Sequence, residues 1–295
     1  MVSPYVRRQR LAAELRKLRE ERGMMADELA KRIHYSRMKI SRLENAHGRP
    51  DVGDVVKILD TLEIPDAQTL EIIRLANQAA TKGWWDRYGD TMGPRQRLYA
   101  DIEAGAGTIR EFNLSSIPGI LQTPELTNAL TELAKNDGPL DFRPDRMAQA
   151  RLQRLETILR PDGPTYEFII DEIVTRRLNV APSIMSAQLC HLVEKVAAEP
   201  RLTVRVLPVD AYLAEALLPK VTFSLYTFPE QSDPPLAVVE TLTTDLVHTD
   251  PREVKRYRKR YEYLAQAALA PQDSLAILTE AASRLADKVG PPYGG

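Results

Sequence analysis

YSRMKISRLE, residues 35–44, is the stretch on which the interpretation of this chain depends. Ile40 and Leu43 are three residues apart, so a helix places them on one side, where aliphatic residues upstream can pack against them. Its basic and hydroxyl side chains are left on the other side. Such a helix fits the major groove of DNA. A solvated basic face has the same composition, so the flanking sequence must distinguish the two interpretations.

Length and composition limit the possible classes of protein. The 295 residues predict two domains with ordinary apolar cores. The single cysteine, Cys190, excludes an internal disulfide framework and fits a reducing compartment. The sequence has no apolar N-terminal signal segment and no apolar run long enough to cross a bilayer. We therefore expect a cytoplasmic protein with no membrane partner.

Charge is distributed unevenly along the chain. Residues 1–50 contain 13 Lys and Arg against 6 Asp and Glu, a net charge of +7, whereas the remaining residues contain 27 against 35, a net charge of −8. A protein that binds nucleic acid concentrates its basic residues on the binding surface. The sequence therefore predicts a nucleic-acid surface within the first 50 residues.

The sequence around residues 35–44 is that of a small helical domain. Residues 6–22 have helical spacing and end at Gly23. A second short helix over 26–33 is separated from the helix at 36–44 by a single turn, which predicts a helix-turn-helix with 36–44 in the recognition position. Ser36 is expected to cap it. With helices at 52–62 and 66–79, residues 1–80 are predicted to form an all-α domain of five helices.

Residues 8–62 resemble the Cro/C1-type helix-turn-helix domain, also called the xenobiotic-response-element (XRE) type. The resemblance rests on blocks in a specific order and spacing, namely LRKLR at 15–19, ELA at 28–30, ISRLEN at 40–45 and RP at 49–50. It implies a five-helix Cro/C1-like fold and double-stranded DNA as the partner.

The same resemblance implies which side chains meet DNA. Those that read base edges are Arg37, Met38, Ser41 and Arg42, and those that hold phosphates are Ser36, Lys39 and Arg49. Because arginine most often contacts guanine, a half-site containing guanine is expected. Met38 has no hydrogen-bond donor, so its expected contact is apolar, such as a thymine methyl group.

The resemblance also implies a structural ion pair and shows two departures. Arg19 and Glu44 match a pair that joins the first helix to the end of the recognition helix, and we expect them to be partly buried. Family members usually have Ser or Thr and then Gln where this chain has Met25 and Ala26, so a helix cap and a phosphate contact are missing. His34 occupies a turn position often taken by Gly, so it must adopt a left-handed conformation or bend the turn differently.

Beyond residue 80 the periodicity predicts a different class of fold. Helices are expected at 94–107, from Thr123-Pro124 onward, and at 144–160, 183–198, 251–269 and 272–287. Short extended segments are expected at 109–112, 166–170, 202–207, 221–228 and 236–241. One βαβ unit followed by an antiparallel hairpin gives a small mixed sheet. Residues 81–290 are therefore predicted to form a C-terminal α+β domain with several long helices and a regulatory or interaction role.

Residues 80–287 resemble the large C-terminal domain of actinobacterial Cro-type regulators that are described as antitoxin-like and whose genes adjoin that of a small partner protein. The matching motifs include GWWD at 83–86, IREF at 109–112, IPGILQT at 117–123, VLP at 206–208 and VET at 239–241. The resemblance implies either a small partner protein or a small-molecule effector. It carries no chemistry to particular residues.

The sequence shows no convincing catalytic or metal-binding group. Cys190 and His191 are adjacent on a predicted helix and point about 100° apart, so they make a poor nucleophile and base, and Cys190 is expected to be buried. Asp171 and Glu172 adjoin at a strand end and project to opposite faces, so helix capping or a hydrogen bond to the turn is expected. The four histidines have no metal-ligand spacing. We expect no enzyme activity, no cofactor and no metal.

Two hypotheses follow for the function. The first is a sequence-specific DNA-binding transcriptional regulator, a homodimer on a pseudo-palindromic operator because one recognition helix reads too few base pairs. Its C-terminal domain would sense a ligand or a partner protein. The alternative is an antitoxin-like interaction module that captures a small partner protein and regulates its own gene. A basic aromatic segment at 256–263 is compatible with DNA, with an acidic partner or with a solvated face.

Overall fold

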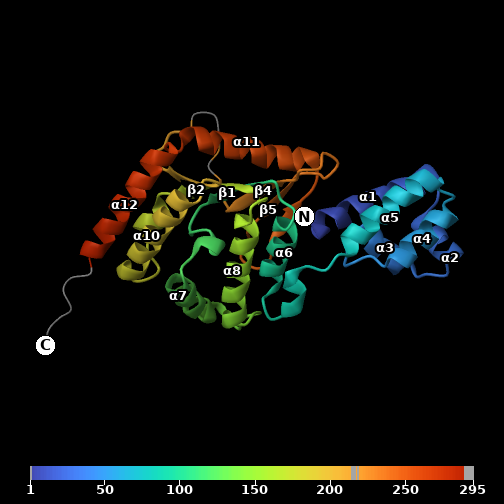
Figure 1. The fold of residues 1–295 in the computed structure, drawn as a ribbon, viewed down its shortest axis with the longest axis horizontal. Helices are drawn as coiled ribbons and strands as arrows, with labels where there is room; N and C mark the ends of the chain where they lie inside the picture. Colours follow the sequence, from blue (N-terminus) through green and yellow to red (C-terminus); the bar gives the residue numbers. More distant parts are fainter. Residues whose placement is uncertain (1, 214–216, 218, 289–295) are drawn as a thin grey trace. The chain divides into compact units, whose positions relative to one another are not determined.

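The computed structural model describes residues 2–213, 217 and 219–288. The chain divides into two compact units (Figure 1), each formed by several segments. Unit 1 consists of residues 1–87, 98–106 and 229–234, and unit 2 of residues 88–97, 107–228 and 235–295. The domain boundary predicted between residues 80 and 81 stays a prediction, and residues 289 and 290 lie outside the described part of the chain.

Unit 1 contains the all-α fold expected from the sequence. Its first five helices are α1 (Pro4–Glu21), α2 (Ala26–Arg32), α3 (Arg37–Glu44), α4 (Val52–Thr61) and α5 (Asp66–Ala80), followed by the 3-10 helix η1 (Trp84–Tyr88). The five-helix prediction is confirmed.

Local sequence explains where the first helices begin and turn. Ser3 caps α1 by accepting a hydrogen bond from the backbone of Val6, and the Ser36 hydroxyl caps α3 in the same way. Met25 precedes α2 and provides no side-chain cap. His34 adopts the left-handed conformation, with φ at 57°. This conformation is strained for a residue other than glycine. The α2–α3 turn therefore forms without the residues that favour it most.

The core of unit 1 lies where these helices meet. Leu15 from α1, Leu29 from α2 and Ile40 from α3 are each at most 1% exposed, and Leu59 and Ala76 continue the cluster into α4 and α5. Burial of apolar surface is the main force that holds such short helices in place. The aliphatic residues of the segment 35–44 thus attach this segment to the core of unit 1.

Unit 2 is built on a six-stranded mixed sheet with the order β3-β2-β1-β4-β5-β6. The strands are β1 (Thr108–Asn113), β2 (Thr165–Asp171), β3 (Leu202–Leu207), β4 (Phe223–Thr227), β5 (Leu236–Val239) and β6 (Leu246–His248). β1, β2 and β3 are parallel, whereas β4 pairs antiparallel with both β1 and β5, and β6 pairs antiparallel with β5. The α+β class with a mixed sheet is confirmed, while the strand β6 was not expected.

Helices cover both faces of this sheet. Apart from α6 (Pro94–Glu103), of which residues 98–103 belong to unit 1, the remaining helices are η2 (Gly119–Leu121), α7 (Pro124–Ala134), η3 (Lys135–Asp137), α8 (Pro144–Leu159), α9 (Ile173–Arg176), α10 (Pro182–Ala198), α11 (Pro251–Ala267) and α12 (Pro271–Asp287). α11 packs on the face that carries Phe112, Phe223 and Leu225. Figure 1 shows α8 on the opposite side of the sheet from α11. Among the described residues, no helix has both the length and the apolar character to cross a bilayer.

Two sequence expectations in this region are wrong. The helix expected over 94–107 ends at Glu103, because the chain then enters the sheet, where the Gly107 N–H donates to the Thr227 carbonyl oxygen at 2.8 Å. A Cβ on Gly105 would lie 2.0 Å from the backbone nitrogen of Ser3. Gly105 therefore allows a close backbone approach between distant segments of unit 1. Cys190 is exposed. α10 buries Met185, Leu189 and Leu192, and Cys190 follows Leu189 by one residue, so it points about 100° away from that face.

Candidate nucleic-acid interface

α3 is held by one buried aliphatic residue and by its C-terminal end. Ile40 is fully buried, and Leu43 packs against the same core from a partly exposed position. Glu44, the last residue of α3, is only 8% exposed. A charged side chain at this depth requires a partner.

Arginines of α1 supply that partner. Arg19 donates hydrogen bonds to both carboxylate oxygens of Glu44, at 2.6 and 2.8 Å, and to the carbonyl oxygen of Met24 at 2.7 Å. These bonds to Glu44 raise the pKa of Arg19. Arg16 donates to the Glu44 carbonyl oxygen at 2.9 Å and to Asn45 Oδ1 at 2.8 Å. The end of α3 is thereby fixed to α1, which sets the direction in which the helix presents its other face.

The face opposite Ile40 is exposed and carries the four side chains expected to read bases. Met38 is 72% exposed, and Arg37, Ser41 and Arg42 are exposed as well. Arg37 lies 3.3 Å from Asp27, an exposed pair that contributes little to stability. Within the described residues, the Arg42 side chain forms no ion pair. The structure thus brings these four residues together on one accessible surface.

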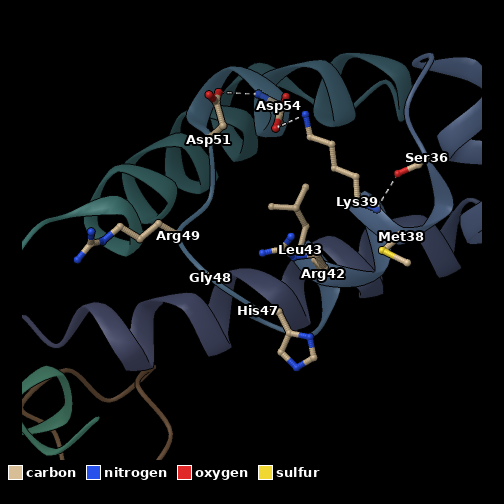
Figure 2. A pocket seen from close by; sticks show the side chains of 10 residues that line it. All are labelled: Ser36, Met38, Lys39, Arg42, Leu43, His47, Gly48, Arg49, Asp51 and Asp54. Carbon is tan, nitrogen blue, oxygen red and sulfur yellow. Dashed lines mark hydrogen bonds and ion pairs between the residues drawn. The ribbon is translucent and has the colours of Figure 1, made fainter. Parts of the chain in front are cut away.

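A groove of about 410 Å³ runs beside this surface, between α3 and the start of α4 (Figure 2). Its lining residues are Ser36, Met38, Lys39, Arg42, Leu43, His47, Gly48, Arg49, Asp51 and Asp54. Five of the seven residues expected to contact DNA are among them. Asp51 and Asp54 add negative charge to this otherwise basic groove, which the sequence did not predict.

Lys39 is not free within this groove. Its ammonium lies 2.7 Å from Asp54 Oδ2 and 3.8 Å from the centre of the Tyr35 ring, and the Tyr35 hydroxyl donates to the same carboxylate. The hydrogen bond to Asp54 raises the pKa of Lys39. Burial favours the neutral form of Asp54, but the hydrogen bonds from Lys39 and Tyr35 outweigh it and lower the pKa of that carboxyl. The positive charge of Lys39 is therefore partly neutralised by Asp54.

The other two residues expected at phosphates also have partners in unit 1. The Ser36 hydroxyl accepts the backbone N–H of Lys39 at 3.2 Å. Arg49 forms an ion pair with Asp86 of η1, whose carboxylate also accepts the backbone N–H of Gly83 at 2.8 Å. Figure 2 shows the Arg49 side chain directed away from Lys39. Their roles at phosphates stay predictions.

Sequence reasoning missed the acidic partners of this surface. Asp27, Asp54 and Asp86 come from three other elements and have no motif spacing to the basic residues that they contact. Only the fold brings them close. Among the described residues, no group of three or more His, Cys, Asp or Glu side chains is placed to hold a metal ion.

Two comparisons with protein families bear on this geometry. A model described as "Helix-turn-helix domain" matches residues 10–72, which contain α3 and its groove. A helix-turn-helix domain indicates a DNA-binding regulator. A second model, "Domain of unknown function (DUF5753)", matches residues 96–280, more than half of the chain. The chain therefore belongs to the DUF5753 family, and its organisation is consistent with an XRE-type regulator that has a large C-terminal domain. No curated protein matches it.

Proposed function

We propose that this protein is a sequence-specific transcriptional regulator that reads DNA with α3. The observation that carries the proposal is the exposed set of Arg37, Met38, Ser41 and Arg42 on a helix whose opposite face and C-terminal end are both fixed. A recognition helix must be rigid to place side chains against base edges. α3 combines accessibility with that rigidity.

Each exposed side chain has a defined role in the proposal. Arg42 has no ion pair within the described residues, so it binds guanine through its two-pronged guanidinium without first breaking an internal contact. Arg37 exchanges its weak pair with Asp27 for a base or phosphate. Met38 contributes apolar contact, and Ser41 donates its hydroxyl. Lys39, Arg49 and Ser36 hold the phosphates on either side.

The proposal includes a homodimer on a pseudo-palindromic operator. One short helix contacts only a few base pairs, and two-fold pairing doubles the length of DNA that is read. Light scattering of the protein alone and on its site measures the stoichiometry. Two chains per site support the dimer, and one chain per site at saturation contradicts it.

Selection of preferred sites from random DNA tests the proposed function. The full chain should enrich a site with guanine at fixed positions in two inverted halves. An Arg42→Ala variant should lose the preference at one position in each half, while Lys31→Ala, which removes an exposed charge from α2, should enrich the same site as the parent. Failure of the parent chain to enrich any sequence would contradict the proposal.

Unit 2 is proposed to sense a ligand or a partner protein and to act without catalysis. The antitoxin-like alternative gains support from exposed apolar side chains in the β3–β4 connection, where Val209, Tyr212 and Leu217 are 56%, 85% and 78% exposed. Large exposed apolar residues in one segment are typical of interaction sites. Co-expression with a small protein encoded by an adjoining gene, as expected from the resemblance to antitoxin-like regulators, tests this alternative. A 1:1 complex that Tyr212→Asp abolishes and Lys220→Asp preserves supports it, and unchanged elution of both proteins contradicts it.

A further inference from the structure

A second concentration of positive charge lies on α11, far in sequence from the helix-turn-helix. Residues 252–260 contain six Lys and Arg and a single acidic residue, Glu253. Outside this segment, the chain beyond residue 50 is acidic, with 34 Asp and Glu against 21 Lys and Arg. The positive charge of this segment is therefore a local feature and does not reflect the composition of unit 2.

α11 places its charges on the side away from the sheet. Val254, Tyr261 and Leu264 are buried in the core of unit 2, and Tyr257 packs against them. The remaining side of the helix carries Arg252, Lys255, Arg256 and Lys259, which are all exposed. Their spacing of three, four and seven residues aligns them along one face. We name these four side chains the α11 basic face, and Figure 1 shows α11 along the outside of the sheet.

Within the described residues, none of these four cations forms an ion pair. Lys259 lies 5.4 Å from the centre of the Tyr263 ring, which leaves its charge unneutralised. Like charges three and four residues apart repel and destabilise a helix. Cations near a helix N-terminus also oppose the helix dipole, and Arg252 and Lys255 lie in the first turns of α11. An anion bound from outside would relieve both effects.

The chemistry of the face distinguishes a nucleic-acid partner from a protein partner. A protein interface normally includes a buried apolar or aromatic anchor. α11 contains none of the large apolar side chains that are exposed on the described part of the chain. Seven residues of helix rise about 10 Å, and each strand of DNA carries one charge per about 3.4 Å of axis. Four cations over this length match several successive phosphates.

We propose that the α11 basic face binds the phosphate backbone of double-stranded DNA, as a sequence-independent contact in addition to that of α3. The contact rests on the proposed DNA-binding function and adds affinity without base preference. Its electrostatic signature is counterion release, because each neutralised phosphate contributes about 0.9 to the slope of log affinity against log salt.

The test measures that slope by fluorescence anisotropy with the full chain and a DNA duplex of random sequence. One variant combines Arg252→Gln, Lys255→Gln, Arg256→Gln and Lys259→Gln. A matched control combines Arg177→Gln, Lys220→Gln, Arg284→Gln and Lys288→Gln, which removes four exposed charges elsewhere in unit 2. The α11 variant should reduce the slope by about 2 to 4, and the control by less than 1. Equal slopes for the two variants would overturn the proposal.

Two further measurements separate this proposal from its alternatives. On the DNA site selected by the parent chain, the α11 variant should bind more weakly while preferring that site by the same ratio over random DNA. If the parent selects a site and the α11 variant binds it with unchanged affinity, only the α11 proposal fails; if the parent binds no DNA, the proposed function fails. A variant that loses binding to poly-glutamate but keeps its DNA affinity would overturn the assignment to DNA in favour of an acidic protein. Circular dichroism spectra that match the parent establish that the variant is folded.

Discussion

Arg19 joins three segments of unit 1 through one guanidinium group. It bonds to Glu44 at the end of α3 and to the carbonyl of Met24 before α2, and both members of the ion pair are almost fully buried. Removing one partner would leave the other buried without neutralisation. This arrangement gives the last residue of α3 a structural role and keeps its side chain against α1, away from solvent.

The first prediction concerns this pair. Glu44→Ala should lower the free energy of unfolding of unit 1 by about 3–5 kcal/mol, because it strands the Arg19 charge. Glu28→Ala, which removes the exposed pair with Arg32, should cost at most about 1 kcal/mol. Urea denaturation followed by circular dichroism measures both. Equal losses for the two variants would contradict the role assigned to the buried pair.

A second residue-scale prediction concerns Glu111 on β1. Burial, and secondarily the nearby negative charge of Glu240, raises the pKa of Glu111 to about 7, while the Tyr166 hydroxyl donates a hydrogen bond to it. The neutral carboxyl is therefore favoured in the folded state, so its contribution to stability is complete below pH 4.5 and is lost as the pH rises through 7. Glu111→Gln should remove this loss, worth up to about 3 kcal/mol. Melting temperatures at pH 5 and pH 8 test it, with the exposed Glu125→Gln as the control. A pH dependence in Glu111→Gln as steep as in the parent would contradict it.

Among the helices, α3 and α4 are joined by an ion pair. Asp54 on α4 holds Lys39 on α3, so the cation is oriented but partly neutralised. A carboxylate beside a phosphate-binding lysine weakens attraction to DNA. The groove between the two helices therefore combines positioning with a restraint on affinity.

Asp54→Asn tests this restraint. It should strengthen binding to all DNA sequences by a similar factor, because it removes a negative charge beside Lys39 and retains a hydrogen-bonding group. Asp60→Asn, also on α4 but outside the lining of the groove, should leave affinity nearly unchanged. Anisotropy titrations on selected and random duplexes give the comparison. Weaker binding in Asp54→Asn would mean that orientation of Lys39 outweighs the repulsion.

Much of the element-level structure could be predicted from local signals. The Ser36 cap and the aliphatic spacing locate α3, and the Asp250 side chain caps α11. The end of α6 was predicted wrongly because the chain there pairs with β4, and the bonded residues Gly107 and Thr227 lie more than a hundred positions apart. The acidic partners of Arg37, Lys39 and Arg49 escaped prediction for the same reason. Signals within a few residues cannot report contacts that only the fold creates.

At the scale of the whole molecule, strand order and unit composition depend on long-range pairing. β1 pairs with β4 across more than a hundred residues, and this pairing links the parallel part of the sheet to the antiparallel part. The segment 229–234 lies between β4 and β5 in sequence yet belongs to unit 1. There, Arg7 of α1 is 3% exposed and forms ion pairs with Glu230 and Asp233. Neither feature has a signature in the sequence.

Arg7→Ala tests the membership of 229–234 in unit 1. The change leaves the buried Asp233 without its closest cation and should destabilise unit 1 by about 3–5 kcal/mol. Arg10→Ala, which removes a more exposed partner of the same acids, should cost less. Hydrogen exchange of the amides of α1 reports the effect. Unchanged protection of α1 in Arg7→Ala would contradict a structural role for this contact.

The specificity of the full chain for its selected DNA site tests whether α3 reads the DNA sequence. Anisotropy should show that the parent binds this site at least about a thousandfold more tightly than random DNA at physiological salt. Combining Arg37→Ala, Ser41→Ala and Arg42→Ala should reduce this ratio to near one while weak, salt-sensitive binding persists. If the triple variant keeps the parent's ratio, α3 does not read the DNA sequence.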